Sequence, residues 1–172
     1  PSIPVEGREF DEAEKSVKER LEKLVSIGGK QSATSFHKRL GKIMWDYCGM
    51  SRNEKGLLKA LDLVKNLREE FWKDLRVPGS LKELNQELEK AARIADFLEL
   101  ADLLIADALF RKESCGAHFR EEYQTADGET LRNDAEYTCV AAWEYAGEGK
   151  APILHREELK FEEVEMKVRS YK

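Results

Sequence analysis

SLKELNQELEKAARIADFLELADLLIADALF, residues 80–110, holds the longest periodic run of apolar residues in the chain. An apolar side chain recurs every three or four residues, which is the spacing of one helix face. These positions are Leu81, Leu84, Leu88, Ala92, Ala95, Leu98, Ala101, Ile105 and Ala108. Ser80-Leu-Lys-Glu83 has the pattern of a capping box, so we predict a helix over residues 81–111. Its second half, from residue 91 to residue 109, is apolar on more than one face, which is typical of a central helix packed on several sides.

Three shorter apolar stripes upstream of this run predict three more helices. Their predicted ranges are 11–26, 35–48 and 53–75. Gly28 and Gly29 follow the first stripe and Gly49 follows the second, and glycine commonly ends a helix. Ser51-Arg-Asn-Glu54 is a second capping box, which predicts the start of the third of these helices.

The pattern changes near the C-terminus. Residues 139–145 (CVAAWEY) are aromatic and β-branched, which favours a strand. Residues 163–169 alternate charged with apolar side chains, and this period of two predicts a second strand, antiparallel to the first. Gly147, Gly149 and Pro152 lie between them as turn residues. We therefore expect a mainly α fold, a helical bundle of three to four helices with a small antiparallel β element at the C-terminus.

The expected organisation is one domain in two parts. Residues 1–136 form the helical bundle, including a charged segment at 111–134, and residues 137–172 form the β element packed on that bundle. The chain has 172 residues, of which 41% are hydrophobic, and this is enough for one core of ordinary size.

Charge and cysteine content exclude several classes of protein. Acidic residues outnumber basic ones by 34 to 29, so the net charge is −5 and no nucleic-acid partner is expected, because phosphate binding needs a basic patch. No stretch approaches the roughly 18 consecutive apolar residues of a membrane span, and the first residues lack a signal-peptide pattern, so we expect a soluble, cytoplasmic protein. The three cysteines lack C-x-x-C spacing and indicate neither a disulfide framework nor a zinc site.

The motifs that bind cofactors or metals are missing from the sequence. The glycines form neither G-x-G-x-x-G nor G-x-x-x-x-G-K-[ST], so no common phosphate-binding loop is present. None of the histidines lies three residues after a glutamate, as in the paired motif of di-metal helical bundles. We therefore expect no cofactor-binding or metal-binding residue in this chain.

Residues 111–134 (RKESCGAHFREEYQTADGETLRND) interrupt the helical pattern with a long, charge-rich segment. Cys115 and His118 leave open a nucleophile and its base, although nothing in the sequence supplies an orienting acid. The simpler alternative is that the three arginines of the segment form ion pairs with neighbouring acids. Exposed pairs of about 0 to 1 kcal/mol each are too weak to order it against roughly 1 to 2 kcal/mol of backbone entropy per residue, so we expect a partner to hold it.

Two stretches resemble one known family of enzymes. RKESCGAHFREEYQT (residues 111–125), followed by RND (132–134), resembles the E-S-R-G-A-H-x-R-x-D … R-D-D signature of the flavoprotein subunit of succinate dehydrogenase and fumarate reductase. LGKIMWDYCGMSRNEKGL (40–57) is similar to the L-x-x-x-M-W-x-x-x-G-x-x-R-x-x-x-G-L helix end that precedes it in that family. The resemblance runs over nearly the whole chain and is closest to the Bacteroidetes-like form, which is found with two-haem, single-membrane-subunit complexes.

The resemblance implies that the chain is the C-terminal helical domain excised from a larger flavoprotein that interconverts succinate and fumarate. In that family, hydride transfer to FAD is followed by electron transfer to an iron–sulfur subunit and on to quinone. The implied partners are the upstream FAD-binding and capping domains, which hold the FAD, the iron–sulfur subunit and, indirectly, the membrane cytochrome b subunit. The resemblance also implies a position at the inner face of the cytoplasmic membrane.

The resemblance implies that no residue of this chain is catalytic and that the charged segment contacts the FAD domain or the iron–sulfur subunit. The expected interface residues are Arg111, Glu113, His118, Arg120 and Arg132. Cys115 stands where many members have Arg, and Asn133 where many have Asp, so a role of that arginine would be absent here or would pass to another arginine of the segment. Two alternatives stay open: a non-catalytic helical protein-interaction module, and the matching domain of L-aspartate oxidase, which has related signatures.

Overall fold

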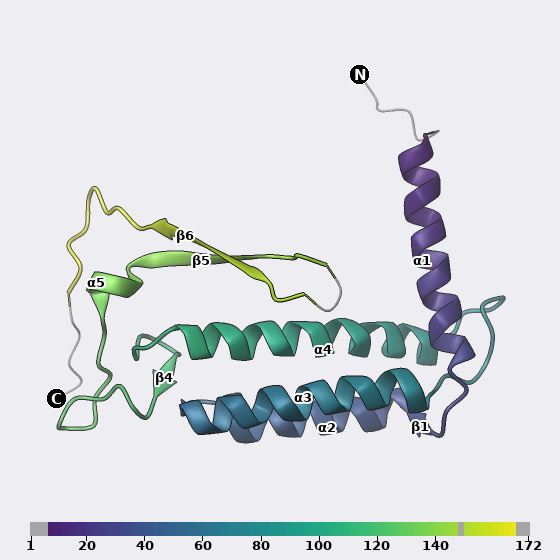
Figure 1. Cartoon of the computed structure of the whole chain (residues 1–172), viewed down its shortest axis with the longest axis horizontal. Coiled ribbons are helices and arrows are strands. Elements are labelled where there is room, and N and C mark those ends of the chain that lie inside the picture. The colour runs from purple at the N-terminus through teal and green to yellow at the C-terminus, as the bar shows by residue number, and fades with distance from the viewer. Residues whose placement is uncertain (1–6, 148–149, 168–172) are drawn as a thin grey trace. The chain divides into compact units, whose positions relative to one another are not determined.

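The computed structural model describes residues 7–147 and 150–167 and is mainly helical (Figure 1). Its helices are α1 (Arg8–Ser26), α2 (Ala33–Cys48), α3 (Glu54–Asp74), α4 (Gln86–Phe110) and α5 (Asp134–Tyr137). Its strands are β1 (Gln31–Ser32), β2 (Ser51–Arg52), β3 (Leu75–Arg76), β4 (Phe119–Arg120), β5 (Cys139–Glu144) and β6 (Ile153–Glu158). This confirms the expected mainly α class with a small antiparallel strand pair near the C-terminus. No helix among the described residues is long and apolar enough to cross a membrane.

The chain divides into two compact units. The first comprises residues 1–41 and 65–99, and the second comprises residues 42–64 and 100–172. Helices α2, α3 and α4 each contribute one part to each unit. The charged segment and the β5–β6 pair both belong to the second unit.

Aromatic rings form the centre of the first unit. Phe36 of α2 meets Phe71 of α3 edge to face, with the ring centroids 5.3 Å apart. Trp72 packs edge-on against Phe71, and the Lys23 ammonium of α1 lies 4.4 Å from a Trp72 ring centroid. Leu24 of α1 is fully buried. Because large rings bury the most apolar area, this cluster connects the parts of α1, α2 and α3 that belong to the unit.

Two glycines end α1 as predicted and allow a close backbone approach. Gly28 has a φ of 62°, the left-handed conformation that commonly ends a helix. At Gly29 a Cβ atom would lie 2.1 Å from the Asp74 carbonyl carbon, so only glycine fits there. The backbone N–H groups of Gly29 and Lys30 donate to the carbonyls of Leu75 at 2.9 Å and Asp74 at 3.0 Å, and β1 then pairs with β3 in parallel.

Helix α4 begins at Gln86, so the prediction of a helix from residue 81 was wrong at its start. Asn85 is the cap: its Oδ1 accepts a backbone hydrogen bond from the first turn at 3.0 Å, and its Nδ2 donates to a carbonyl of the preceding turn at 2.9 Å. Ser80 N does donate to Glu83 Oε1 at 3.2 Å, but this contact closes a turn ahead of the helix. Asparagine caps as well as serine does, and its amide here also fixes the preceding turn, so the helix starts after it.

One face of α4 is buried and another is open. Ala91, Leu98 and Ile105 are buried, whereas Leu100 and Leu104 are 50% and 52% exposed. Within the described residues α4 is therefore packed along one stripe, and not on several sides as expected.

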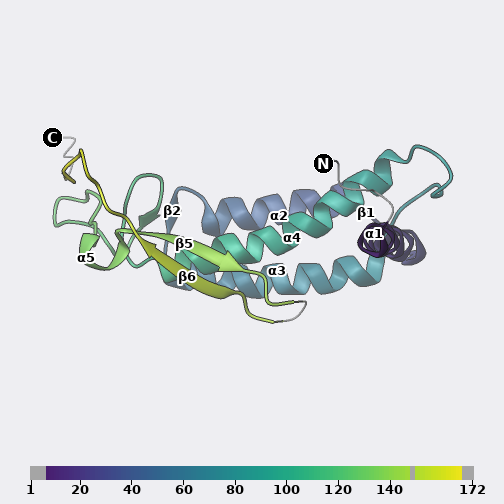
Figure 2. The same cartoon turned by 90° about the horizontal axis from the view of Figure 1, so that it is seen from above.

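β5 and β6 form an antiparallel pair in the second unit (Figure 2). Their register places Trp143 opposite Leu154. Trp143 connects the pair to the end of α4, because its Nε1–H donates to Asp107 Oδ1 at 2.8 Å and its ring packs edge-on against Phe110. The guanidinium carbon of Arg156 in β6 lies 5.6 Å from the Phe110 ring centroid, so both strands of the hairpin contact the last turn of α4.

The first of the two predicted C-terminal strands lies where expected, and the second does not. Residues 163–167 are not a strand, residues 168 and 169 lie outside the described residues, and the partner of β5 is residues 153–158. The alternating pattern therefore predicted the second strand at the wrong position in the sequence. The nearer segment pairs because the connection it closes is shorter and costs less chain entropy. Gly147, with a φ of 110°, and Pro152 lie in that connection as predicted, and Gly149 is outside the described residues.

The cap of α4 can be tested by substitution. Asn85→Ala removes the acceptor at the helix start and is expected to lower the free energy of unfolding by about 1 kcal/mol. Ser80→Ala is the matched control and is expected to cost less than about 0.5 kcal/mol, because its side chain lies outside the helix. Urea unfolding followed by circular dichroism measures both losses. Equal losses for the two variants would contradict a helix start at Gln86.

Candidate functional site

The two stretches that carry the family resemblance meet in the second unit. β2 pairs in parallel with β4, which places Arg52 opposite Arg120. The backbone N–H of Glu121 extends the ladder by donating to the Arg52 carbonyl at 2.8 Å. A short parallel ladder between β2 (Figure 2) and β4 (Figure 1) therefore fixes the charged segment to the chain just before α3.

Two carboxylates of the charged segment bind the start of α3. Glu121 accepts hydrogen bonds from Ser51 Oγ at 2.7 Å and from Asn53 Nδ2 at 2.9 Å. Glu122 Oε1 accepts from the backbone N–H of Glu54 at 2.5 Å. The cap itself is Asn53, whose Oδ1 accepts from a backbone N–H of the first turn at 2.7 Å, so the prediction of a Ser51–Glu54 capping box was wrong. Ser51 lies in β2, which turns its hydroxyl to Glu121 instead of to the helix.

The pKa values of both carboxylates reflect these contacts. Hydrogen bonds from Ser51 and Asn53 lower the pKa of Glu121 below its ordinary value. Burial by itself would raise the pKa of Glu122, but the backbone N–H of Glu54 and the guanidinium of Arg120 outweigh it and lower the pKa overall. Both groups are therefore anionic at neutral pH. A negative charge at a helix N-terminus is favourable because the helix dipole is positive there.

Arg120 is a buried cation at the end of α4. Its side chain is 2% exposed, and its Nη1 donates to the Ala108 carbonyl in the last turn of α4 at 2.7 Å. Its Nε donates to Glu122 Oε2 at 3.1 Å, and its guanidinium carbon lies 5.5 Å from the Tyr123 ring centroid. The Ser114 hydroxyl binds both the N–H and the carbonyl of Arg120, at 2.8 and 3.1 Å. The carbonyls of a last helical turn lack intrahelical partners, so Arg120 satisfies one of them.

Glu113 closes the charged segment on itself. Its side chain is 2% exposed, its Oε1 accepts from Arg111 Nη1 at 2.8 Å, and its Oε2 accepts from the backbone N–H of Asn133 at 2.8 Å. Arg111 Nη2 also donates to the Cys139 carbonyl at 3.2 Å. The start and the end of the segment are thus joined through one buried carboxylate.

Both ring nitrogens of His118 are engaged. Nε2 lies 2.9 Å from the Arg111 carbonyl, which can only accept, so Nε2 carries the proton and Nδ1 accepts from Arg52 Nη1 at 3.0 Å. Burial lowers the pKa of His118, and the guanidinium groups of Arg52, Arg120 and Arg111 lower it further, against the opposing effect of the Arg111 carbonyl. The imidazole is therefore neutral at neutral pH and orients the Arg52 guanidinium.

Arg132 lies at the far end of the segment. Its Nε and Nη2 donate to Asp134 Oδ1 at 2.9 and 2.6 Å, and its Nη1 donates to the Lys167 carbonyl at 3.2 Å. The hydrogen bond and charge of Asp134 raise the pKa of Arg132. These contacts connect the segment to the chain that follows β6, and the Arg132 side chain stays partly exposed.

Cys115 and His118 are not arranged as a nucleophile and its base. Their backbones pair with each other, with N···O distances of 2.8 and 3.1 Å, around a turn in which Gly116 has a φ of 59°. Neither ring nitrogen of His118 is available to take a proton from the thiol, because one donates to a carbonyl and the other accepts from Arg52. Across residues 7–147 and 150–167, no group of three or more His, Cys, Asp or Glu side chains could hold a metal ion.

The structure brings the five predicted site residues into one segment of the second unit, but with different exposure. Arg111, His118 and Arg132 remain partly exposed, while the remaining two, Glu113 and Arg120, are buried. The expectation that the ion pairs of this segment would be exposed was wrong for Glu113 and Arg120, whose side chains are each 2% exposed. Sequence reasoning missed four further contributors. They are Arg52, Ser114, Glu121 and Glu122, of which the first is the Arg of the G-x-x-R part of the family-like pattern.

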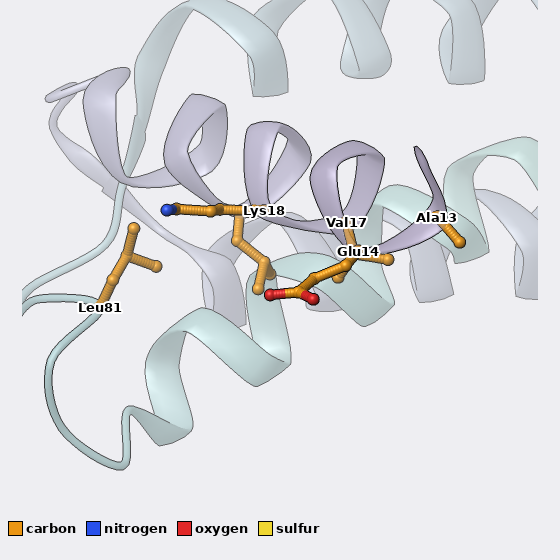
Figure 3. A pocket seen from close by; sticks show the side chains of 6 residues that line it. Ala13, Glu14, Val17, Lys18 and Leu81 are labelled. Carbon is orange, nitrogen blue, oxygen red and sulfur yellow. The ribbon is translucent and has the colours of Figure 1, made fainter. Parts of the chain in front are cut away.

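An open pocket lies in the first unit beside α1 (Figure 3). Its lining residues are Ala13, Glu14, Val17, Lys18, Leu21 and Leu81. None of the predicted site residues is among them, and one acid with one base on an open helix face offers no catalytic arrangement. The charged segment is therefore the stronger candidate for function.

Residues 37–171 match the family model described as fumarate reductase flavoprotein C-term. The chain belongs to this family. The fumarate reductase flavoprotein subunit of Haemophilus influenzae is 31% identical over 127 residues, 74% of this chain and 20% of that protein. The succinate dehydrogenase flavoprotein subunit of Bacillus subtilis is 26% identical over 162 residues, 94% of this chain and 26% of that protein. This member of the family thus spans about a quarter of the length of these relatives or less.

Solved structures share the fold of this family member. Quinol fumarate reductase of Escherichia coli matches with a TM-score of 0.76 and 24% identity, over 92% of this chain and 26% of that chain. Adenylylsulfate reductase of Archaeoglobus fulgidus matches with a TM-score of 0.68 and 21% identity, over 94% of this chain and 26% of that chain. Identities this low establish a common fold and nothing about the reaction.

Protonation of His118 is expected to destabilise the fold as the pH falls below neutrality. Its folded-state pKa lies below its ordinary value of 6.5, so between those two pKa values the unfolded chain binds more protons than the folded chain. Its contribution is fully present above 6.5, declines as the pH falls through the folded-state pKa, and then levels off. Urea unfolding from about pH 8 to about pH 5 measures this slope.

His118→Gln should remove that part of the pH dependence. His155→Gln is the matched control, because His155 forms an exposed pair with Glu144 on the hairpin and should leave the slope in place. A slope that survives in His118→Gln would assign the titration to another group.

Replacing the buried guanidinium should be costly. Arg120→Met leaves the Ala108 carbonyl without this partner, while Glu122 is 37% exposed and keeps the backbone N–H of Glu54. The variant is therefore expected to lower the free energy of unfolding by about 1 to 3 kcal/mol. Arg93→Met on α4 is the control, because Arg93 pairs with Glu89 at the surface and should contribute about 0 to 1 kcal/mol. Denaturant unfolding of the two variants compares them directly. A loss for Arg120→Met as small as that for the control would contradict a structural role of this buried contact.

Proposed function

We propose that this chain is the C-terminal domain of the flavoprotein subunit of a succinate dehydrogenase or fumarate reductase. The full subunit would interconvert succinate and fumarate with FAD and pass electrons to an iron–sulfur subunit and quinone. One observation carries the proposal. The two stretches that resemble this family, residues 40–57 and 111–125, are far apart in sequence. They form one ladder and one hydrogen-bonded cluster at β2 and β4, inside the region that matches the family model.

The chain itself is not suited to hold FAD. Its sequence contains no glycine-rich phosphate-binding loop, and the charged segment engages its cations with its own carboxylates and carbonyls. We infer that FAD and the dicarboxylate are bound by FAD-binding and capping domains outside this chain. The domain proposed here therefore supports assembly and supplies no reacting group.

Within that assembly, the charged segment is proposed as a contact surface for the FAD domain or the iron–sulfur subunit. The partly exposed side chains of Arg111, His118 and Arg132 would make the contacts. Glu113 and Arg120 would act by holding the segment in shape, because both are buried against the chain's own backbone and side chains. A preformed surface loses less conformational entropy on binding than a mobile loop does.

The further partners follow from the proposed complex. The iron–sulfur subunit would contact the flavoprotein directly, and the membrane cytochrome b subunit would be reached through it. This would place the flavoprotein at the inner face of the cytoplasmic membrane as a peripheral subunit.

The proposed function is tested with the full-length flavoprotein and this chain side by side. The full-length protein should carry FAD, measured by its visible absorbance, and should oxidise succinate with an artificial electron acceptor. This chain alone should be colourless and inactive. A full-length protein that oxidises L-aspartate instead of succinate, or one without flavin, would contradict the proposal.

The contact surface is tested separately by Arg132→Ala in the full-length flavoprotein. Because its ion pair is partly exposed, the variant should change the free energy of unfolding of this chain by about 0 to 1 kcal/mol. It should nevertheless lower the flavin content or the co-purification of the iron–sulfur subunit. Arg93→Ala, which removes an exposed guanidinium from α4, is the control and should change neither.

A further inference from the structure

Arg52 differs from the other arginines of the site in its partners. The others each pair with a carboxylate: Arg111 with Glu113, Arg120 with Glu122 and Arg132 with Asp134. Arg52 binds two neutral acceptors, since its Nε donates to the Gly49 carbonyl at 2.8 Å and its Nη1 to His118 Nδ1 at 3.0 Å. Among the residues that the structure describes, no carboxylate forms an ion pair with it.

The geometry of β2 directs Arg52 away from Glu121. Ser51 and Asn53, on either side of Arg52 in sequence, both bind Glu121. Successive side chains of a strand point to opposite faces, so Arg52 is turned to the other face. The group it meets there is the His118 ring, on which two more guanidinium groups also act. Positive charge therefore gathers on this face without a carboxylate directed at Arg52.

His118 fixes the position of Arg52 without compensating its charge. A carboxylate in the place of the imidazole would hold the guanidinium equally well, but it would also neutralise it. A neutral imidazole accepts one hydrogen bond and leaves the full positive charge in place. Arg52 is only partly exposed, so this charge is less screened by water than that of a surface arginine.

We propose that Arg52 receives a carboxylate side chain from the part of the flavoprotein outside this chain. The guanidinium is planar and matches a carboxylate with two parallel N–H donors, and its Nη2 has no partner among the described residues. Two hydrogen bonds already hold it in place, so little side-chain entropy is lost when the carboxylate binds. The matched part is 20% to 26% of the length of these relatives, so most of the subunit is available to supply the carboxylate.

The inference rests on the proposed function in one respect, because the carboxylate would belong to the rest of the flavoprotein. It goes beyond the predicted contact residues, because Arg52 was not among them. It also gives His118 a defined part as a positioning residue.

Phenylglyoxal, which modifies accessible guanidinium groups, tests whether Arg52 is covered. Its reaction rate at Arg52 is measured by mass spectrometry in this chain and in the full-length flavoprotein, with N-acetylarginine in each tube to normalise the reagent. The rate should fall by about tenfold or more in the full-length protein, as for a contact that is closed most of the time. Circular dichroism of this chain confirms that it is folded under the same conditions.

Three outcomes of that experiment would overturn the proposal. Equal rates in the two proteins would show that nothing covers Arg52. Protection that appears only after the iron–sulfur subunit is added would assign the partner to that subunit. Protection of Arg52 by succinate in this chain alone would show that the Arg52 guanidinium binds a small dicarboxylate and not a protein side chain.

A second measurement identifies the covering group as a carboxylate. Arg52→Lys places a primary amine at the same position, and a water-soluble carbodiimide joins an amine to a carboxylate in contact with it by forming an amide. The full-length variant should yield a cross-linked peptide pair that joins position 52 to an Asp or Glu outside this chain. The wild-type protein, which has no amine at position 52, is the matched control. Absence of the pair in a folded, flavin-containing variant would contradict the carboxylate.

The two proposals can fail independently. Flavin content and succinate oxidation of the wild-type full-length protein decide the proposed function, whatever Arg52 does. A flavin-containing, active protein in which Arg52 reacts as fast as in this chain overturns only the inference about Arg52.

Discussion

The buried guanidinium of Arg120 is the contact on which the second unit depends. It donates to the Ala108 carbonyl in the last turn of α4 and to Glu122, and Glu122 in turn accepts from the backbone N–H of Glu54 at the start of α3. A cation at the C-terminal end of one helix and an anion at the N-terminal end of another are each favoured by the helix dipole. One ion pair therefore joins two helix ends and fixes the segment that carries it.

Burial explains why a segment so rich in charge is ordered. Exposed ion pairs contribute little, but a buried charge that has lost its water must be paired and hydrogen-bonded, so the alternative arrangements of the segment are costly. Glu113 and Arg120 meet this condition with partners from the chain itself. The carbonyl of Arg111, the partner of Glu113, accepts a hydrogen bond from His118 Nε2, and His118 Nδ1 accepts one from Arg52. These two hydrogen bonds fix the positions of His118 and Arg52. A surface held in this way can present charge to a partner with little rearrangement.

Both helix starts that the sequence marked with a serine begin instead after an asparagine. Ser51 and Ser80 have the capping-box spacing, yet Asn53 and Asn85 are the caps. The two residue types differ little in capping energy, so neighbouring contacts decide between them. At α3 the deciding contact is Glu121, which binds Ser51 and Asn53 together from a distant part of the sequence.

The sequence by itself determined the four long helices, the mainly α class and the motifs that place the chain in its family. These features depend on periodicity and on neighbours within a few positions, which a single sequence displays directly. Only the tertiary structure decided which strand pairs with β5, which nitrogen of His118 carries the proton, and which of the four described arginines of the site, Arg52, forms no ion pair with a carboxylate. Those outcomes depend on groups that are far apart in the chain, such as Arg52 and His118 at a separation of 66 positions, and on the burial that brings them together. Which charged side chains pair depends on which of them lie close together in the folded chain. Partners that are distant in sequence cannot be recognised from neighbouring residues.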